Sequence, residues 1–136
     1  MSQHGYSSTP LVKKLGIKPG FKVRFIHSPD NYLDLLGEIP EEVVILKSKR
    51  RLANFIHVFC KDVKTFEKEV VKLKDEIEKD GMIWFSWYKK ASKIPTDLTE
   101  SIVRNTILTM GLVDIKKCAI DDKWSGLKAV WRKENR

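Results

Sequence analysis

The sequence predicts an open, mostly parallel α/β sheet in three layers, with helices on both faces and a C-terminal antiparallel hairpin. Two observations lead to this prediction. Apolar runs of strand length alternate along the 136 residues with amphipathic helical segments, a pattern typical of a parallel sheet with crossover helices. The last two strand-like segments are separated only by a turn, so we expect them to pair antiparallel.

The centre of the predicted sheet is a strand, a helix and a second strand. Residues 55–60 and 82–87 are apolar runs without polar alternation, as in strands that are buried on both faces. Between them, apolar residues recur at helical spacing over residues 63–77, with Asp62 as the expected N-cap and Gly81 just past the helix end. The crossover should be right-handed, which places the ends of both strands at one edge of the sheet.

Flanking segments supply the other elements. Asp97 and Glu100 have the spacing of a capping box, so we expect a helix to begin there. Residues 121–126 read as the turn of the C-terminal hairpin. The remaining predictions are helices at residues 10–15, 31–36 and 97–110, and strands at 21–27, 43–46, 113–119 and 127–131.

The composition indicates a basic, water-soluble protein. Its formal net charge is +8, and it has no apolar stretch near the roughly 20 residues of a membrane-spanning helix. We expect one cytoplasmic domain over residues 1–136, with a flexible segment at 1–8 and no membrane contact. Cys60 and Cys118 both lie in apolar segments, where free thiols are expected.

Five short segments along the chain have distinctive sequences. They are GYSSTPL (residues 5–11), KLGIKPG (14–20), WYKKA (87–91), TDLTE (96–100) and WSGL (124–127). Together they resemble an uncharacterised bacterial family of small Rossmann-like proteins, a domain of unknown function. This resemblance covers nearly the whole chain and implies no particular activity.

The second half of the chain is also similar to class I methyltransferases, whose Rossmann-like sheet ends in an antiparallel hairpin. Lys18-Pro19-Gly20 resembles the segment before their cofactor-binding strand. Those enzymes have glycines after that strand and an acidic residue after the next, whereas this chain has His27-Ser28-Pro29-Asp30 and Lys47. We therefore expect no cofactor, and keep a degenerate methyltransferase-like protein dependent on S-adenosylmethionine (SAM) as an alternative.

Ligands of open parallel sheets bind outside the carboxyl ends of the strands. Trp87 and Tyr88, followed by Lys89 and Lys90, could hold a planar anionic ligand by stacking and charge. Alternatively, Trp87 packs beneath the next loop and the lysines are only solvated, while helix capping accounts for Asp97. The predicted ligand-binding residues are His27, Ser28, Trp87, Tyr88, Lys89, Lys90, Asp97 and Thr99.

No group of residues predicts catalysis or a metal site, because the three histidines are scattered and no Cys/His cluster occurs. The leading hypothesis is a non-catalytic binding or regulatory module for an anionic small molecule or a protein partner. A further alternative is nucleic-acid binding through the basic cluster Lys47, Lys49, Arg50 and Arg51.

Overall fold

The computed structural model describes residues 9–136, and the expected flexible segment 1–8 lies outside the described residues. A six-stranded sheet forms the centre of the molecule. Its strands are β1 (Lys22–Ile26), β2 (Val44–Ile45), β3 (Ala53–Phe59), β4 (Ile77–Tyr88), β5 (Leu112–Ala119) and β6 (Trp124–Trp131). The helices are α1 (Leu11–Leu15), α2 (Tyr32–Leu36), α3 (Val63–Leu73) and α4 (Glu100–Thr109), with 3₁₀ turns η1 (Lys90–Ser92) and η2 (Lys133–Asn135).

The strands follow the order β2-β1-β3-β4-β6-β5. β1 is parallel to β2 and β3, and β3 is parallel to β4, whereas β6 is antiparallel to both β4 and β5. This mostly parallel sheet with a C-terminal hairpin confirms the predicted Rossmann-like fold class. Because β1, β3 and β4 run in the same direction, their carboxyl ends lie at one edge of the sheet.

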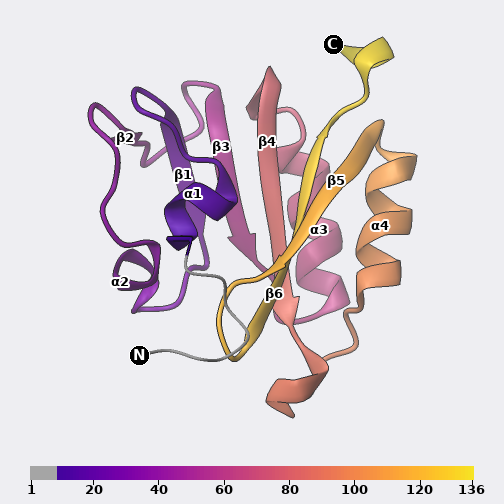
Figure 1. The fold of residues 1–136 in the computed structure, drawn as a ribbon. Coiled ribbons are helices and arrows are strands. Elements are labelled where there is room, and N and C mark those ends of the chain that lie inside the picture. Colours follow the sequence, from indigo (N-terminus) through magenta and orange to yellow (C-terminus); the bar gives the residue numbers. More distant parts are fainter. Residues whose placement is uncertain (1–8) are drawn as a thin grey trace.

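Helices lie on both faces of the sheet (Figure 1). Alternate residues of β3 point into two cores: Ile56 and Val58 pack with residues of α3 and α4, whereas Phe55 and Phe59 pack with residues of α1 and α2. Burial on both faces explains why residues 55–59 of the strand are apolar apart from His57. None of the helices within residues 9–136 combines the length and apolarity that a bilayer crossing requires.

The boundary between α3 and β4 differs from the sequence prediction. The helix ends at Leu73, and Ile77 is the first residue of β4 rather than the last of the helix. Leu73 and Ile77 are both buried in the α3/α4 core, so a spacing of four continues although the backbone leaves the helix. Gly81 is not a helix stop: it lies within β4, and a Cβ there would be 3.0 Å from the carbonyl oxygen of Asn54.

The start of α4 also differs from the prediction. Its N-cap is Thr99, whose Oγ1 accepts a hydrogen bond from the N–H of Ile102 at 3.3 Å. The predicted capping residue, Asp97, instead accepts a hydrogen bond from the N–H of Val63 at 2.8 Å. Asp97 therefore helps to cap α3, although it lies 34 residues further along the chain than Val63.

The C-terminal hairpin is antiparallel as predicted, but its turn is tighter than expected. Asp121 Oδ1 accepts hydrogen bonds from the N–H groups of Lys123 and Trp124. This side-chain-to-backbone bonding closes the turn early, so β6 begins at Trp124 rather than at Leu127.

Candidate functional site

Two clefts open at the edge formed by the carboxyl ends of β1, β3 and β4, and both are lined by Tyr88 and Ile94. The mixed-charge cleft has a volume of about 680 Å³, and the basic cleft a volume of about 610 Å³. The charged groups of the mixed-charge cleft are Asp30, Lys61, Asp121, Asp122 and Lys123, and His27 also lines it. Those of the basic cleft are Lys89, Lys90, Lys93, Glu100 and Lys117, with Thr99 beside them.

The residues predicted to form one site are divided between these clefts. His27 and Ser28 line the mixed-charge cleft, whereas Lys89, Lys90 and Thr99 line the basic cleft. Trp87 and Tyr88 also line the basic cleft, and Asp97 lines neither. Sequence reasoning missed Lys93 and Lys117, although Lys93 follows the predicted basic segment by only three positions.

The aromatic residues contribute unequally to the clefts. Trp87 is only 5% exposed and belongs to the core beneath α3 and α4, whereas the alternative interpretation placed it beneath the loop that follows. Tyr88 is half-buried and stacks on Trp124, with ring centroids 4.2 Å apart and an interplanar angle of 27°. A planar ligand would therefore meet the tyrosine ring, which Trp124 holds in place.

The basic cleft has an uncompensated positive charge. Within the described part of the chain, no carboxylate forms an ion pair with Lys89, Lys90 or Lys93. Glu100 is the acidic residue of the lining, and its oxygens accept hydrogen bonds at 2.6 Å from Lys117 and from Arg104. These bonds, that from Lys117 first, lower the pKa of the Glu100 carboxyl. The one acidic charge of the lining is thus already paired.

The amino-terminal end of α4 adds to this positive field. The first turn of a helix leaves N–H groups without partners inside the helix, and Glu100 and Ser101 from that turn line the basic cleft. A helix N-terminus attracts anions through these groups and through the helix dipole. Asp97 does not line the basic cleft, and its carboxylate accepts a hydrogen bond at the start of α3.

The mixed-charge cleft presents charges of both signs, with two lysines and three aspartates in its lining. At its rim, His27 has a left-handed backbone (φ 57°), and its Nε2 lies 3.1 Å from Glu69 Oε2. The Glu69 side chain is 9% exposed and also lies 3.6 Å from Lys72 Nζ. A zwitterion matches such a lining better than a simple anion does.

Beneath the clefts lies a buried polar network that the sequence analysis did not predict as a whole. His57 Nδ1 is 2.6 Å from the Tyr32 hydroxyl, and its Nε2 is 2.7 Å from Ser86 Oγ. Burial lowers the pKa of His57 to about 3, so this histidine is neutral at physiological pH. Burial, with smaller contributions from Glu69 and Asp62, raises the pKa of the nearby Cys60 thiol to about 12. Neither group is poised for acid, base or nucleophilic chemistry.

No family model and no curated protein matches the chain by sequence, so its resemblance to an uncharacterised bacterial family stays a prediction. Solved structures do match. A ribosomal protein L11 methylase from Lactobacillus delbrueckii subsp. bulgaricus has a TM-score of 0.59 at 10% identity, covering 89% of this chain and 74% of its own. The chain has a methyltransferase-like fold.

Two other structures support this likeness. A SAM-dependent methyltransferase from Aquifex aeolicus has a TM-score of 0.58 at 16% identity, covering 87% of this chain and 86% of its own. The complex of DhpI with SAH has a TM-score of 0.58 at 8% identity, covering 90% of this chain and 83% of its own. At these identities the likeness extends to the fold alone.

The residues at the end of β1 do not fit SAM in the way that glycine-rich methyltransferase loops do. A glycine-free segment, residues 27–31, follows the strand. Within it the His27 side chain contacts Glu69, and the Pro29 carbonyl accepts a hydrogen bond from the N–H of Tyr32 at the start of α2. The segment therefore lacks the glycines that allow a backbone to approach the cofactor closely. Lys47, an exposed cation, follows β2 in place of an acidic residue.

Proposed function

We propose that this protein is a methyltransferase-like binding module that does not transfer methyl groups, and that its basic cleft binds an anionic small molecule. The observation that most directly supports the proposal is a set of three lysines beside the start of α4: Lys89, Lys90 and Lys93 form no ion pair with a carboxylate of residues 9–136. An anion would neutralise the lysines and accept hydrogen bonds from the helix terminus.

The size and lining of the basic cleft favour a phosphate-bearing compound of nucleotide size. A volume of about 610 Å³ lies within the range of about 300 to 1,000 Å³ that small-molecule sites occupy. Lysine ammonium groups and helix N-termini both bind phosphate well. Tyr88 gives such a ligand an aromatic edge beside the cations.

A calorimetric titration tests this site. ADP is titrated into the wild-type protein and into the Lys89→Ala/Lys90→Ala variant, and we expect the variant to bind at least about tenfold more weakly, a loss of roughly 1.4 kcal/mol. The matched control is Lys64→Ala/Lys68→Ala, which removes the same charge from the exposed surface of α3. If all three proteins bind ADP with equal affinity and have unchanged melting temperatures, the basic cleft is excluded as the ADP site.

The anion need not be a nucleotide, and a thermal-shift screen identifies its class. Adenine nucleotides, coenzyme A, sugar phosphates and SAM are compared with the wild-type protein. A ligand at about 100 times its Kd adds roughly 2.7 kcal/mol to the stability of the folded state. If none of them raises the melting temperature, the small-molecule proposal fails and an anionic protein segment becomes the occupant to test.

A degenerate SAM-dependent methyltransferase-like protein is the second candidate. The comparisons support this candidate more directly than the first, because the similar structures are methyltransferases. The mixed-charge cleft would be its site, since aspartates and lysines together match the ammonium and carboxylate groups of SAM. We expect Asp30→Asn to weaken SAM binding if this candidate is correct, and Lys89→Ala/Lys90→Ala to leave it unchanged. Absence of binding at millimolar SAM would exclude it.

A further inference from the structure

Four lysines that are distant in the sequence converge on one side of the sheet, and we call them the lysine face: Lys14 in α1, Lys18 after it, Lys116 in β5 and Lys128 in β6. Lys116 lies opposite Lys128 in the strand ladder, and its Nζ donates to the Lys14 carbonyl oxygen at 3.0 Å. The Lys128 ammonium lies 3.4 Å from the point that a Cβ on Gly16 would occupy. Folding therefore concentrates positive charge at a place that the linear sequence does not reveal.

Three of the four lysines, Lys18, Lys116 and Lys128, form no ion pair with a carboxylate of residues 9–136. The pKa of Lys128 is lowered, first by its burial and then by Lys116 and Lys18. Like charges held this close oppose one another, and an anion from outside the chain would relieve the repulsion.

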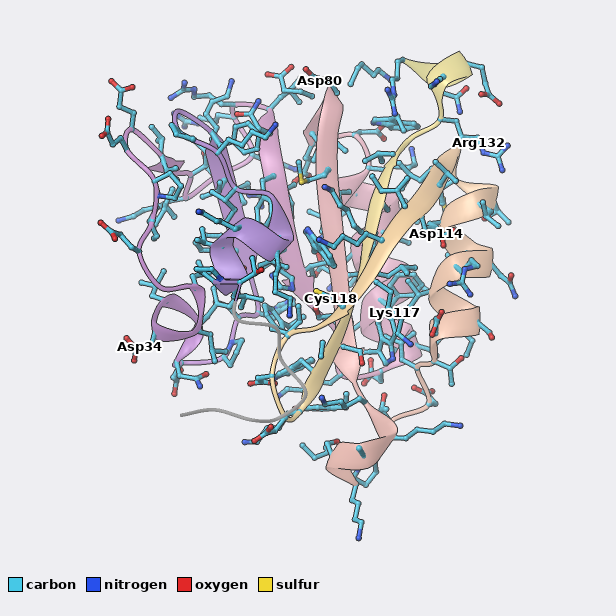
Figure 2. All side chains as sticks on the ribbon, viewed as in Figure 1. Asp34, Asp80, Asp114, Lys117, Cys118 and Arg132 are labelled. Atoms are coloured by element: carbon cyan, nitrogen blue, oxygen red, sulfur yellow. The ribbon has the colours of Figure 1, made fainter. Side chains whose placement is uncertain are left out.

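No helix of residues 9–136 covers this side of the C-terminal hairpin (Figure 1). In Figure 1, α1 lies in front of β1 and β3, α2 lies toward the β2 edge, and neither helix lies in front of β5 and β6. Lys117 turns the other way and pairs with Glu100 of α4. Cys118 is the next residue: burial raises the pKa of its thiol, and the charges of Lys14 and Lys116 oppose that rise. Figure 2 shows Lys117 toward α4 and Cys118 near the crossing of β5 and β6. The lysine face is thus separate from the basic cleft.

We propose that the lysine face binds the phosphate backbone of nucleic acid without reading its sequence. A small anion on such an open surface would be weakly held because water and salt screen it. A polyanion contacts several lysines at once and gains from the release of its counterions. The exposed large apolar side chains of the described residues are all aliphatic, so contacts to phosphate should outweigh base stacking on this surface. Contacts to phosphate alone specify no sequence.

Fluorescence anisotropy with a labelled RNA strand and a labelled DNA duplex tests this proposal. The proteins are wild type, Lys116→Ala/Lys128→Ala, and the charge-matched control Lys64→Ala/Lys68→Ala. We expect Lys116→Ala/Lys128→Ala to bind at least about tenfold more weakly, and its salt slope to fall by about 1.4 for the single strand and 1.8 for the duplex. An equal loss in the control would show that only net charge matters, and would overturn the proposal.

Three further measurements locate the contact between protein and nucleic acid and identify its chemistry. Lys116→Arg/Lys128→Arg keeps both charges, so we expect it to retain binding and to show that the loss in the alanine variant is not a folding defect. Pyrophosphate that displaces the RNA at the same phosphate concentration as unlabelled RNA would indicate a small-anion site and contradict the proposal. Loss of binding only in Lys47→Ala/Lys49→Ala would place nucleic acid on the loop after β2, again contradicting it.

The proposal that the lysine face binds nucleic acid and the proposal that the basic cleft binds a small anion can be rejected independently. We expect Lys116→Ala/Lys128→Ala to keep the affinity of the basic cleft for ADP, and Lys89→Ala/Lys90→Ala to keep the affinity for nucleic acid. A loss of nucleic-acid binding only in Lys89→Ala/Lys90→Ala would assign both ligands to the basic cleft.

Discussion

The mixed-charge cleft and the basic cleft open on the same edge of one sheet, have similar volumes and share Tyr88, yet they have opposite charge balances. In the basic cleft four lysines face one glutamate, and that glutamate is already paired. In the mixed-charge cleft three aspartates outnumber two lysines. The topology of the sheet thus determines where ligands can bind, while the loops that follow the strands determine which ligands those are.

Charge reversal should separate the two clefts by the largest margin. We expect Lys89→Glu/Lys90→Glu to weaken ADP binding by about 100-fold or more, because two attractions become repulsions of at least roughly 1.4 kcal/mol each. The matched change in the other cleft, Lys61→Glu/Lys123→Glu, should leave the affinity within about twofold, since its charges are farther from the ligand. Calorimetric titration measures both, and similar losses in the two variants would remove the distinction between the clefts.

The core beneath both clefts should make the stability depend on pH. Burial holds the pKa of His57 at about 3 against an ordinary value of 6.5, so below pH 6.5 the unfolded chain takes up a proton that the folded protein does not. The contribution of His57 to the free energy of unfolding is therefore complete above pH 6.5. Below that pH the free energy of unfolding falls by up to about 1.4 kcal/mol per pH unit as the pH drops toward 3.

Urea unfolding between about pH 7 and pH 5 measures this slope, above the range in which most carboxylates titrate. The control is His57→Gln, which keeps hydrogen-bonding groups but does not titrate, so we expect it to be less stable and to have a flatter slope over this range. All other ionisable groups are the same in the two proteins and cancel in the comparison. Equal slopes would show that His57 is not the buried titrating group.

Loss of the α4 cap should weaken only the basic cleft. We expect Thr99→Ala to lower the free energy of unfolding by about 1 kcal/mol, because the N–H of Ile102 loses its acceptor. The affinity for ADP should also fall by about threefold as the helix terminus loosens. Thr99→Ser keeps the hydroxyl and should behave as the wild type, while SAM binding, if present, should not change in either variant.

Removal of the paired carboxylate should have the smallest effect, and in the opposite direction. Glu100→Gln takes one negative charge from the lining of the basic cleft, so we expect ADP to bind about two- to threefold more tightly. Asp30→Asn makes the same change in the mixed-charge cleft and should not alter ADP binding. Weaker ADP binding by Glu100→Gln would indicate that its pairing with Lys117 positions the lysine for the ligand.

Much of the fold could be predicted from the sequence, because most elements bury one or two apolar faces with clear periods. The exceptions have physical causes. Ile77 lies four residues after Leu73 and faces the same core. The apolar spacing therefore stays helical beyond the end of α3, and the sequence predicts a helix that is too long. Asp97 has the residue type of an N-cap but caps a helix that precedes it by 34 positions. A local sequence pattern cannot show where a helix gives way to a strand that faces the same core, or which helix a capping residue serves.

The candidate site was predicted in part. The position of Lys89 and Lys90 at the end of a central strand follows from the sequence and from the rule for parallel sheets. The division into two clefts does not, because it depends on where the turn at Asp121 folds back beside Tyr88. The lysine face was not predicted at all, since its members are brought together across more than 100 residues.

The most direct test of the central claim is a map of backbone amide shifts in a ¹⁵N-labelled sample titrated with ADP. We expect the largest shifts at Glu100 and Ser101, at the start of α4, and at Lys89 and Lys90, whose side chains line the basic cleft. Residues 27–31 and 121–123, which border the mixed-charge cleft, should shift little. The opposite distribution would place the ligand where methyltransferases hold their cofactor, and would contradict the assignment of the basic cleft as the binding site.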